Sequence, residues 1–304
     1  MAKNAMVIYH DNCNDGFGAA FAFWKWHAKN YDNVIYHAAN YGSMWPDVDK
    51  TWDVYILDFS YAPEQLVKIA GRANYVRLLD HHKTAMEAWK EYDENECKPV
   101  PDNLYVTFDM GHSGAMLAYE YFVPDTGCLN NVAFSMFAML EDRDLWKFQR
   151  KDTKAFHAYL SLANKTFGVW DSIGQTLLTD YGYQDIIDKG ELLLLQFEKQ
   201  CEEIVRIGRY PVTLYLKSDN YSGLICNCPP MFASDIGNIL AKESGTFALT
   251  WYEDYEGRVK GSLRSIGDYD VSAIAKELGG GGHKNAAGFE RTSIYHFNDL
   301  LIPF

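Results

Sequence analysis

Long apolar runs are missing from this sequence of 304 residues. No stretch approaches the roughly 20 apolar residues that a transmembrane helix needs, and the longest run, residues 133–140, is interrupted by Ser135. The opening residues, MAKNAMVIYHDN, contain no apolar signal region before the first acidic residue. We therefore expect neither a membrane segment nor a secretory signal.

Cysteines are scattered, at positions 13, 97, 128, 201, 226 and 228. Only Cys226 and Cys228 are close together, and their spacing fits neither a disulfide framework nor a zinc ribbon. This pattern predicts a reduced, cytoplasmic location.

Positive charge is also scarce, since 28 Lys and Arg face 41 Asp and Glu, for a net charge of −13. A protein that coats duplex nucleic acid needs basic residues to neutralise phosphates, so this class is disfavoured. A small basic pocket, or an acidic cluster that holds divalent cations, is not excluded. With 48% hydrophobic and 23% charged residues the chain can bury a core, and its length favours two domains.

Strand-like and helix-like segments alternate in the first half of the chain. We expect strands at residues 5–9, 34–38, 52–57, 75–79 and 104–108, and helices at 16–29, 63–71, 113–122 and 129–140. Such alternation is typical of an α/β fold, here a mostly parallel N-terminal sheet with helices on both faces.

A long helical stretch at 185–208 separates this part from a second set of strands and helices. We expect an N-terminal domain over residues 1–184, with a helical extension at about 146–184, and a connecting helix over 185–208. A smaller C-terminal α/β domain would cover 209–304 and lie across a cleft from the first.

Acidic residues, histidines and one cysteine follow the predicted strands directly. They are His10, Cys13 and Asp15 after the first strand, Asp58 after the third, Asp80, His81 and His82 after the fourth, and Asp142 and Asp144 after a helix. The carboxyl ends of parallel strands meet at one sheet edge, where ligands bind. Carboxylates and imidazoles gathered there suit Mn, Fe or Zn, and two bridged metals can clamp a phosphoryl group.

Each of these residues alone has a simpler explanation. An Asp after a strand is usually a helix cap or turn former, and a single loop histidine is usually structural. Four such clusters in sequential order are much harder to explain by chance, so the metal-site interpretation is favoured.

Four segments, HDNCNDG (10–16), YILDFS, LLDHHKT and EDRDLW, resemble the motifs of the DHH phosphoesterase superfamily. Farther on, GSLRS (261–265) and GGGGHKNAAGF (279–289) resemble the DHH-associated substrate-binding domain of its nano-RNase and RecJ-like branch. The resemblance covers residues 5–150 and 210–290, nearly the whole chain.

The resemblance implies a role for each matching residue. His10, Cys13 and Asp58 would hold a first metal, and Asp15, Asp58, His81 and Asp142 a second, with Asp58 bridging. Asp80 would orient an imidazole, and His82 would face the substrate phosphate and stabilise the leaving oxygen. Asp142 is preferred over Asp144 because EDRDLW then aligns with the family's Asp-Thr-x-x-aromatic pattern.

The first motif departs from the family, which usually has Asp-x-Asp where this chain has Cys13-Asn14-Asp15. A thiolate ligand would shift the metal preference from Mn toward Zn or Fe. Alternatively, Cys13 is a small buried residue, and the first metal is held weakly or with help from Asp11.

The C-terminal motifs predict phosphate binding. A glycine run that includes Gly281 and Gly282 lets backbone N–H groups approach an anion closely. His283 would add a donor there, and Arg264 could bind a phosphate or a terminal base through its fork of donors.

Other candidate contacts lie outside these motifs. His112 and Ser113, at the start of a predicted helix, could contact a substrate phosphate, or Ser113 could simply cap that helix. Tyr41, Trp45 and Trp146 are aromatic residues that could stack on bases, although most aromatics of the chain belong to the core.

The resemblance implies a phosphodiesterase of exonuclease type that uses two divalent ions, Mn first, and attacks phosphorus with a metal-bridging hydroxide. Substrates would be short single-stranded oligonucleotides, dinucleotides or nucleotides. Alternatives are a phosphomonoesterase on nucleoside bisphosphates, a pyrophosphatase-like enzyme, or a nucleotide-binding regulator with a degraded metal site. The sequence leaves open the natural substrate, the native metal, homodimer formation and the role of residues 146–184.

Overall fold

A computed structural model describes residues 2–11, 13–94, 99–123, 131–217 and 219–302. The chain forms two compact units, Met1–Leu194 and Leu195–Phe304. Cys97, Cys128 and residues 129 and 130 of an expected helix lie outside the described residues.

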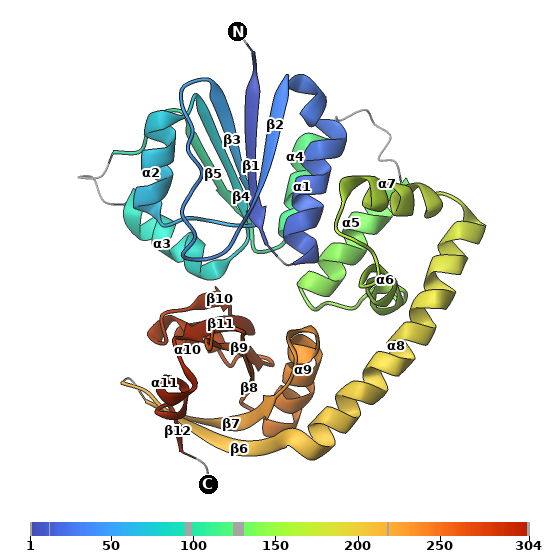
Figure 1. The fold of residues 1–304 in the computed structure, drawn as a ribbon, viewed down its shortest axis with the longest axis vertical. Helices are drawn as coiled ribbons and strands as arrows, with labels where there is room; N and C mark the ends of the chain where they lie inside the picture. The colour runs from blue at the N-terminus through green and yellow to red at the C-terminus, as the bar shows by residue number, and fades with distance from the viewer. Residues whose placement is uncertain (1, 12, 95–98, 124–130, 218, 303–304) are drawn as a thin grey trace. The chain divides into compact units, whose positions relative to one another are not determined.

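The first unit is built on a parallel sheet of five strands in the order β2-β1-β3-β4-β5 (Figure 1). Its strands are β1 (Asn4–His10), β2 (Asn33–Ala39), β3 (Trp52–Leu57), β4 (Tyr75–Asp80) and β5 (Leu104–Phe108). The chain leaves β1 toward β2 on one side and later adds β3 on the other. This switch point places the ends of β1 and β3 next to each other, and a crevice at such a point is where open α/β sheets bind ligands.

Helices cover both faces of this sheet, as expected from the sequence (Figure 1). The helices are α1 (Asn14–Trp26), α2 (Pro63–Arg72), α3 (Lys83–Asp93), α4 (Gly114–Phe122) and α5 (Asn131–Asp144). Alternate residues of β1 face opposite ways: Ala5 and Val7 pack in the core with α1 and α4, and Met6 and Ile8 in the core with α2.

Three more helices follow: α6 (Thr153–Leu160), α7 (Phe167–Thr176) and the long α8 (Asp180–Gly208), which crosses from the first unit into the second. Short 3₁₀ helices lie at Ala28–Asn30 and Pro230–Phe232. No helix within the described ranges combines the length and the apolar character that crossing a bilayer requires.

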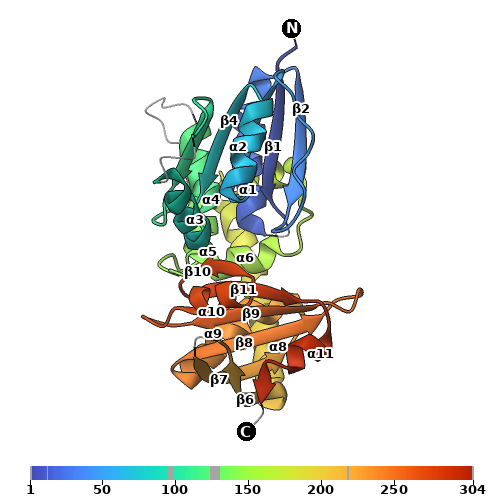
Figure 2. The ribbon, with the colours of Figure 1, turned by 90° about the vertical axis from the view of Figure 1, so that its left-hand side faces the viewer.

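The second unit has a mixed sheet of seven strands in the order β10-β11-β9-β8-β7-β6-β12 (Figure 2). They are β6 (Arg209–Tyr215), β7 (Asn220–Asn227), β8 (Phe247–Glu253), β9 (Val259–Ser265), β10 (Gly281–His283), β11 (Ala286–Arg291) and β12 (Leu301–Ile302). Only the β7–β8 pair among them is parallel. Its helices are α9 (Ala233–Ser244), α10 (Val271–Glu277) and α11 (Ile294–Asn298). The predicted α/β class of this part of the chain is confirmed.

One partly buried histidine makes the stability of the first unit depend on pH. His157 Nε2 donates to the Met139 carbonyl at 3.0 Å, and burial, with help from the charge of Arg143, lowers the pKa of His157 from 6.5 to about 4. The unfolded chain therefore binds more protons than the folded chain between these two values, and stability falls as the pH falls through that window.

We expect the free energy of unfolding of the metal-free protein to drop by up to about 3 kcal/mol between pH 6.5 and pH 4 because of this residue. His157→Gln should lack that part of the drop, as urea titrations of both proteins at several pH values would show. An identical pH dependence in the two proteins would contradict this assignment.

Candidate metal centre

The candidate ligands stand on three short connections at the carboxyl edge of the first sheet. His10 ends β1, Asp58 follows β3, and His81 follows β4. The strand register pairs Tyr9 with Leu57 and Leu57 with Leu79, so these connections lie side by side.

Helix α1 brings two further groups to this edge. The Cys13 sulfur accepts the Gly16 N–H at 3.0 Å and so caps the helix, and Asp15 lies in its first turn. Gly16 is required here because a Cβ at that position would lie 2.3 Å from the His10 carbonyl oxygen. The helix can therefore begin directly against His10.

The first donor group consists of His10, Cys13 and Asp58. The Cys13 Sγ lies 3.6 Å from His10 Nδ1 and 3.4 Å from Asp58 Oδ2, to which the thiol donates. The third side of the triangle, His10 Nδ1 to Asp58 Oδ2, measures 3.7 Å. One nitrogen, one sulfur and one oxygen thus converge on a single small volume.

The second donor group surrounds His81 Nε2. This atom lies 3.0 Å from Asp58 Oδ1, 3.6 Å from Asp15 Oδ2 and 3.5 Å from Asp144 Oδ2. One imidazole nitrogen and three carboxylates therefore face one another, and the side chains of His81, Asp15 and Asp58 are almost completely buried.

Asp58 belongs to both groups, because Oδ2 faces the first and Oδ1 faces the second. Its Oδ1 accepts no hydrogen bond from the described residues, although His81 Nε2 is 3.0 Å away. Asp58 is only 1% exposed and has a φ of 53°, a left-handed conformation that costs energy for a residue other than glycine. Strained backbone of this kind is concentrated at functional sites.

The pKa shifts within the cluster indicate that a bound cation would stabilise it. Burial, with the charges of Asp144 and Asp58, raises the pKa of Asp15 well above its usual value. Burial, with the charges of Asp58 and Asp15, likewise raises the pKa of the Cys13 thiol. Burial alone would raise the pKa of Asp58 too, but His10 and His81 outweigh it and lower that pKa. A divalent ion would stabilise all three anionic forms together.

The residues present therefore fit a DHH-type metal site. The donor set of imidazole, carboxylate and thiolate suits divalent transition metals. The geometry also shows an orphaned, buried oxygen on the residue shared by both groups.

Asp80 fixes the neighbouring imidazole. Its Oδ1 lies 2.7 Å from His82 Nδ1 and also accepts the backbone N–H of His81 at 2.8 Å. Burial would lower the pKa of His82, but the charge of Asp80 outweighs burial and raises it. This pair is a hydrogen-bonded unit that sets the orientation of His82.

The structure brings Asp144, and not the preferred Asp142, to the cluster. Asp142 instead accepts hydrogen bonds from the backbone N–H groups of Gln149 and Arg150 and from the Thr153 hydroxyl. Its carboxylate thereby fixes the turn after α5, in which Trp146 and Phe148 both have positive φ. The motif alignment favoured Asp142, which holds the turn, whereas Asp144 is the residue that faces His81.

The start of α4 is occupied by protein carboxylates. Asp15 accepts the N–H groups of Gly114 and Ala115 at 2.6 and 3.1 Å, and Ser113 caps the helix through Met116 N–H. His112 Nδ1 lies 2.9 Å from Glu141 Oε2.

Glu141 also accepts the Ser113 N–H at 3.1 Å and pairs with Lys147 at 3.5 Å. Ser113 therefore caps this helix, and a contact between His112 and a substrate phosphate stays a prediction. Sequence reasoning missed Glu141, although it stands at the head of the EDRDLW segment.

In the second unit, Gly281 and Gly282 of the glycine run lie in strand β10. Gly281 pairs with Gly288 and Gly282 with Ala287. A Cβ at Gly282, whose φ is 141°, would lie 2.6 Å from the Ala286 carbonyl oxygen. Close strand pairing accounts for this glycine, and phosphate binding by Gly281, Gly282 and His283 stays a prediction.

Arg264 lies on β9 of the same sheet. Its guanidinium donates to Ser234 Oγ and Ser262 Oγ, both at 2.8 Å. Its role toward a phosphate or base also stays a prediction.

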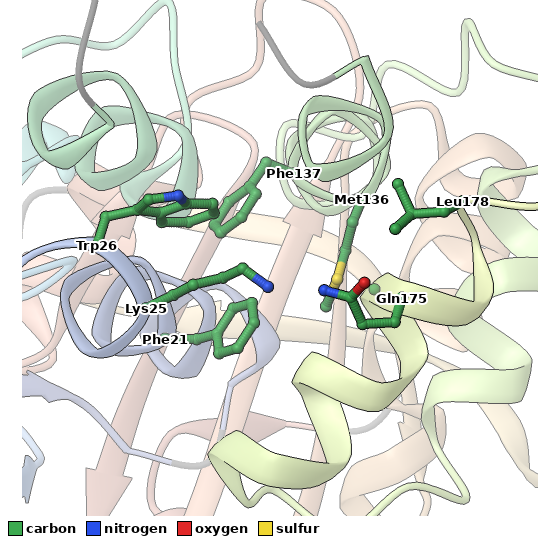
Figure 3. Close-up of a pocket in the computed structure, with 8 residues that line it drawn as sticks. Phe21, Lys25, Trp26, Met136, Phe137, Gln175 and Leu178 are labelled. Atoms are coloured by element: carbon green, nitrogen blue, oxygen red, sulfur yellow. The ribbon is translucent and has the colours of Figure 1, made fainter. Parts of the chain in front are cut away.

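A small cavity in the first unit lies between α1, α5 and α7 (Figure 3), and none of the metal-ligand candidates lines it. Its lining residues are Phe21, Lys25, Trp26, Met136, Phe137, Gly174, Gln175 and Leu178. With a volume of about 70 Å³ it has room for a handful of water molecules and not for a nucleotide. The amine of Lys25 pairs with Asp171.

Comparison with known proteins identifies the family of the chain. The DHHA1 domain family matches residues 231–301. Over 306 residues the chain is 30% identical to "Uncharacterized protein R106" of Acanthamoeba polyphaga mimivirus, an alignment that covers 95% of this chain and 68% of that protein. The chain belongs to the DHH phosphoesterase family and carries a C-terminal DHHA1 domain.

A second relative is the Oligoribonuclease NrnB of Bacillus subtilis (strain 168), 28% identical over 240 residues. That alignment covers 74% of this chain and 55% of the relative, so the chain spans about half of its length.

Two solved structures each align with 98% of this chain: a pGpG-specific phosphodiesterase, PggH, from Vibrio cholerae and an exopolyphosphatase-related protein from Bacteroides fragilis. The alignments cover 96% and 90% of those chains, with identities of 11% and 14% and TM-scores of 0.42 and 0.44. Similarity this distant supports no conclusion about function.

Proposed function

We propose that this DHH-family phosphoesterase hydrolyses phosphodiester bonds in short oligonucleotides or dinucleotides and depends on two divalent metal ions. The observation that carries the proposal is the position of Asp58, whose two oxygens face two separate donor groups. A single structural ion would need only one such group.

His10, Cys13 and Asp58 would hold one ion, and Asp15, Asp58, His81 and Asp144 the other. When bound, such a pair supplies positive charge for phosphoryl oxygens and activates water near neutral pH. We expect Mn first, with Zn or Fe favoured if the Cys13 thiolate is a ligand.

The chain's own residues orient the reaction. Asp80 holds the His82 ring through Nδ1 at 2.7 Å, which fixes the direction of the opposite ring edge. We assign His82 the hydrogen bond to the leaving oxygen, which builds up negative charge as the ester bond breaks. The burial of this pair keeps its hydrogen bond away from competing water.

The substrate class is inferred from two sources. The DHHA1 match and the oligoribonuclease among the relatives both favour nucleotides over inorganic polyphosphates. Arg264 and His283 of the second unit are proposed to contact the substrate, as the resemblance implies.

Metal removal and readdition test this proposal. The purified protein, stripped with a chelator, should cleave neither bis-p-nitrophenyl phosphate nor a 5′-labelled dinucleotide, and Mn²⁺ should restore cleavage of both. Parallel additions of Zn²⁺ and Fe²⁺ would rank the metals. Failure of every metal to support turnover of either compound would overturn the proposal.

Asp144 and Asp142 give opposite predictions. Asp144→Asn should lower kcat/KM at least about a hundredfold and weaken metal binding. It should cost little stability, because burial disfavours the charge of Asp144 and raises its pKa in the metal-free protein. Asp142→Asn removes a charged acceptor of three hydrogen bonds and should cost about 1–3 kcal/mol of unfolding free energy. Steady-state kinetics, metal titration and thermal melts of both variants would reveal the contrast. A greater loss of metal affinity in the Asp142 variant would reverse this assignment.

A further inference from the structure

A large exposed aromatic side chain stands directly beside the candidate metal centre. Tyr41, in the turn after β2, is 53% exposed. Its ring centroid lies 5.8 Å from that of His10 and 6.0 Å from that of His82, and both contacts are edge-to-face. The ring centroid of Phe59, which follows Asp58 in sequence, lies 5.4 Å from that of Tyr41. The tyrosine thus touches residues from all three connections that build the centre.

The turn that carries Tyr41 is fixed by hydrogen bonds. Asn40 and Ser43 exchange two of them, Asn40 N–H to Ser43 Oγ and Ser43 N–H to the Asn40 carbonyl. The Asn40 side chain donates to Asp11 Oδ2 at 3.2 Å, next to His10. Gly42 has a φ of 88°, which a glycine adopts without strain. These hydrogen bonds therefore hold the turn that carries the Tyr41 ring.

The two other aromatic candidates differ from Tyr41 in their surroundings. The Arg72 guanidinium lies 5.4 Å from the Trp45 ring, which also packs against the core. The Arg143 guanidinium lies 4.3 Å from the Trp146 ring, and Phe148 packs edge-on against it at 5.0 Å. Tyr41 combines exposure with contact to the centre, and no cation lies over its ring among the described residues.

We propose that Tyr41 stacks on a nucleobase of the substrate and thereby selects base-bearing phosphodiesters, an inference that rests on the proposed function. A phosphate held beside Asp58 would bring the attached nucleoside within reach of the ring. Stacking is sequence-tolerant because every base has a π-face. The site would accordingly distinguish nucleotides from simple phosphate esters without reading base identity.

The test compares two substrates of the Mn-loaded full chain. One is a dinucleotide, and the other is the same phosphodiester with both bases removed, so that only the two sugars remain. Tyr41→Leu should reduce the preference for the base-bearing substrate, measured as a ratio of kcat/KM values, by about tenfold. Tyr41→Phe should keep the preference. Tyr105→Leu is the matched control. It removes a tyrosine that is similarly exposed, at 46%, and that lies on β5, three residues before the last residue of that strand.

Equilibrium binding of both compounds to metal-free wild-type and Tyr41→Leu protein gives a readout that does not require turnover. A base-dependent affinity that the variant loses would support stacking even if no cleavage occurs, in which case only the proposed function fails. An unchanged preference in Tyr41→Leu would overturn the inference. Equal losses of kcat/KM on both substrates, together with loss of bound metal, would also overturn it. The ring would then act only by positioning His10 and His82.

Discussion

Asp58→Asn should reduce phosphodiester hydrolysis at least about a thousandfold, equivalent to ~4 kcal/mol of transition-state stabilisation. Asparagine has nearly the same volume as aspartate and tolerates the left-handed φ of 53°, so the backbone is preserved. The substitution removes the negative charge and leaves an amide nitrogen where one of the two facing oxygens stood. Both donor groups thus lose their shared ligand at once.

Metal analysis by mass spectrometry should show the same variant binding fewer ions than the wild type. Asp47→Asn is the matched control, because Asp47 pairs with Arg72 at the surface and its side chain is 84% exposed. That control should leave both turnover and metal content unchanged. Activity of Asp58→Asn within a few fold of wild type would contradict the role assigned to Asp58.

Gly114→Ala should impair the protein almost as strongly, through packing alone. A Cβ at position 114 would lie 2.3 Å from the Asp58 Cβ and 2.5 Å from its Oδ1. Either α4 must shift away from the sheet edge, which breaks the Asp15 caps, or Asp58 must leave its position. We expect a loss of about 1–3 kcal/mol in unfolding free energy and at least a hundredfold loss of kcat/KM, equivalent to ~2.7 kcal/mol.

Gly71→Ala separates this clash from the general effect of replacing a helical glycine. Gly71 lies in α2, and nothing lies within 4 Å of the position its Cβ would take. The control should therefore gain about 0.5–1 kcal/mol, because alanine favours the helix over glycine. Equal behaviour of the two variants in melts and kinetics would show that α4 does not hold Asp58 in place.

The parallel sheet and its site edge were predictable because the relevant signals are local. Asp58 directly follows the short apolar strand β3, and β4 ends at Asp80 just before the histidine pair, so the parallel arrangement brings these groups together. The sequence did not predict α3, whose Met86 and Trp89 recur at helical spacing directly after the histidine pair.

Other features depend on backbone geometry that spacing cannot reveal. Asp142 and Asp144 both suit a metal, and only the turn with positive φ at Trp146 and Phe148 determines which of them faces His81. The capping of α1 by Cys13 is likewise a matter of geometry, since a thiol in that place could have been merely buried. The pairing of Gly281 and Gly282 with β11 depends on the chain fold, and the glycine run by itself does not indicate it.

The most direct test of the account is anomalous diffraction from crystals of the full chain grown with Mn²⁺. The account predicts two manganese peaks, one on each side of the Asp58 carboxylate, with His10 and Cys13 beside one and Asp15 and His81 beside the other. A single peak, or peaks that Asp58 does not touch, would contradict it.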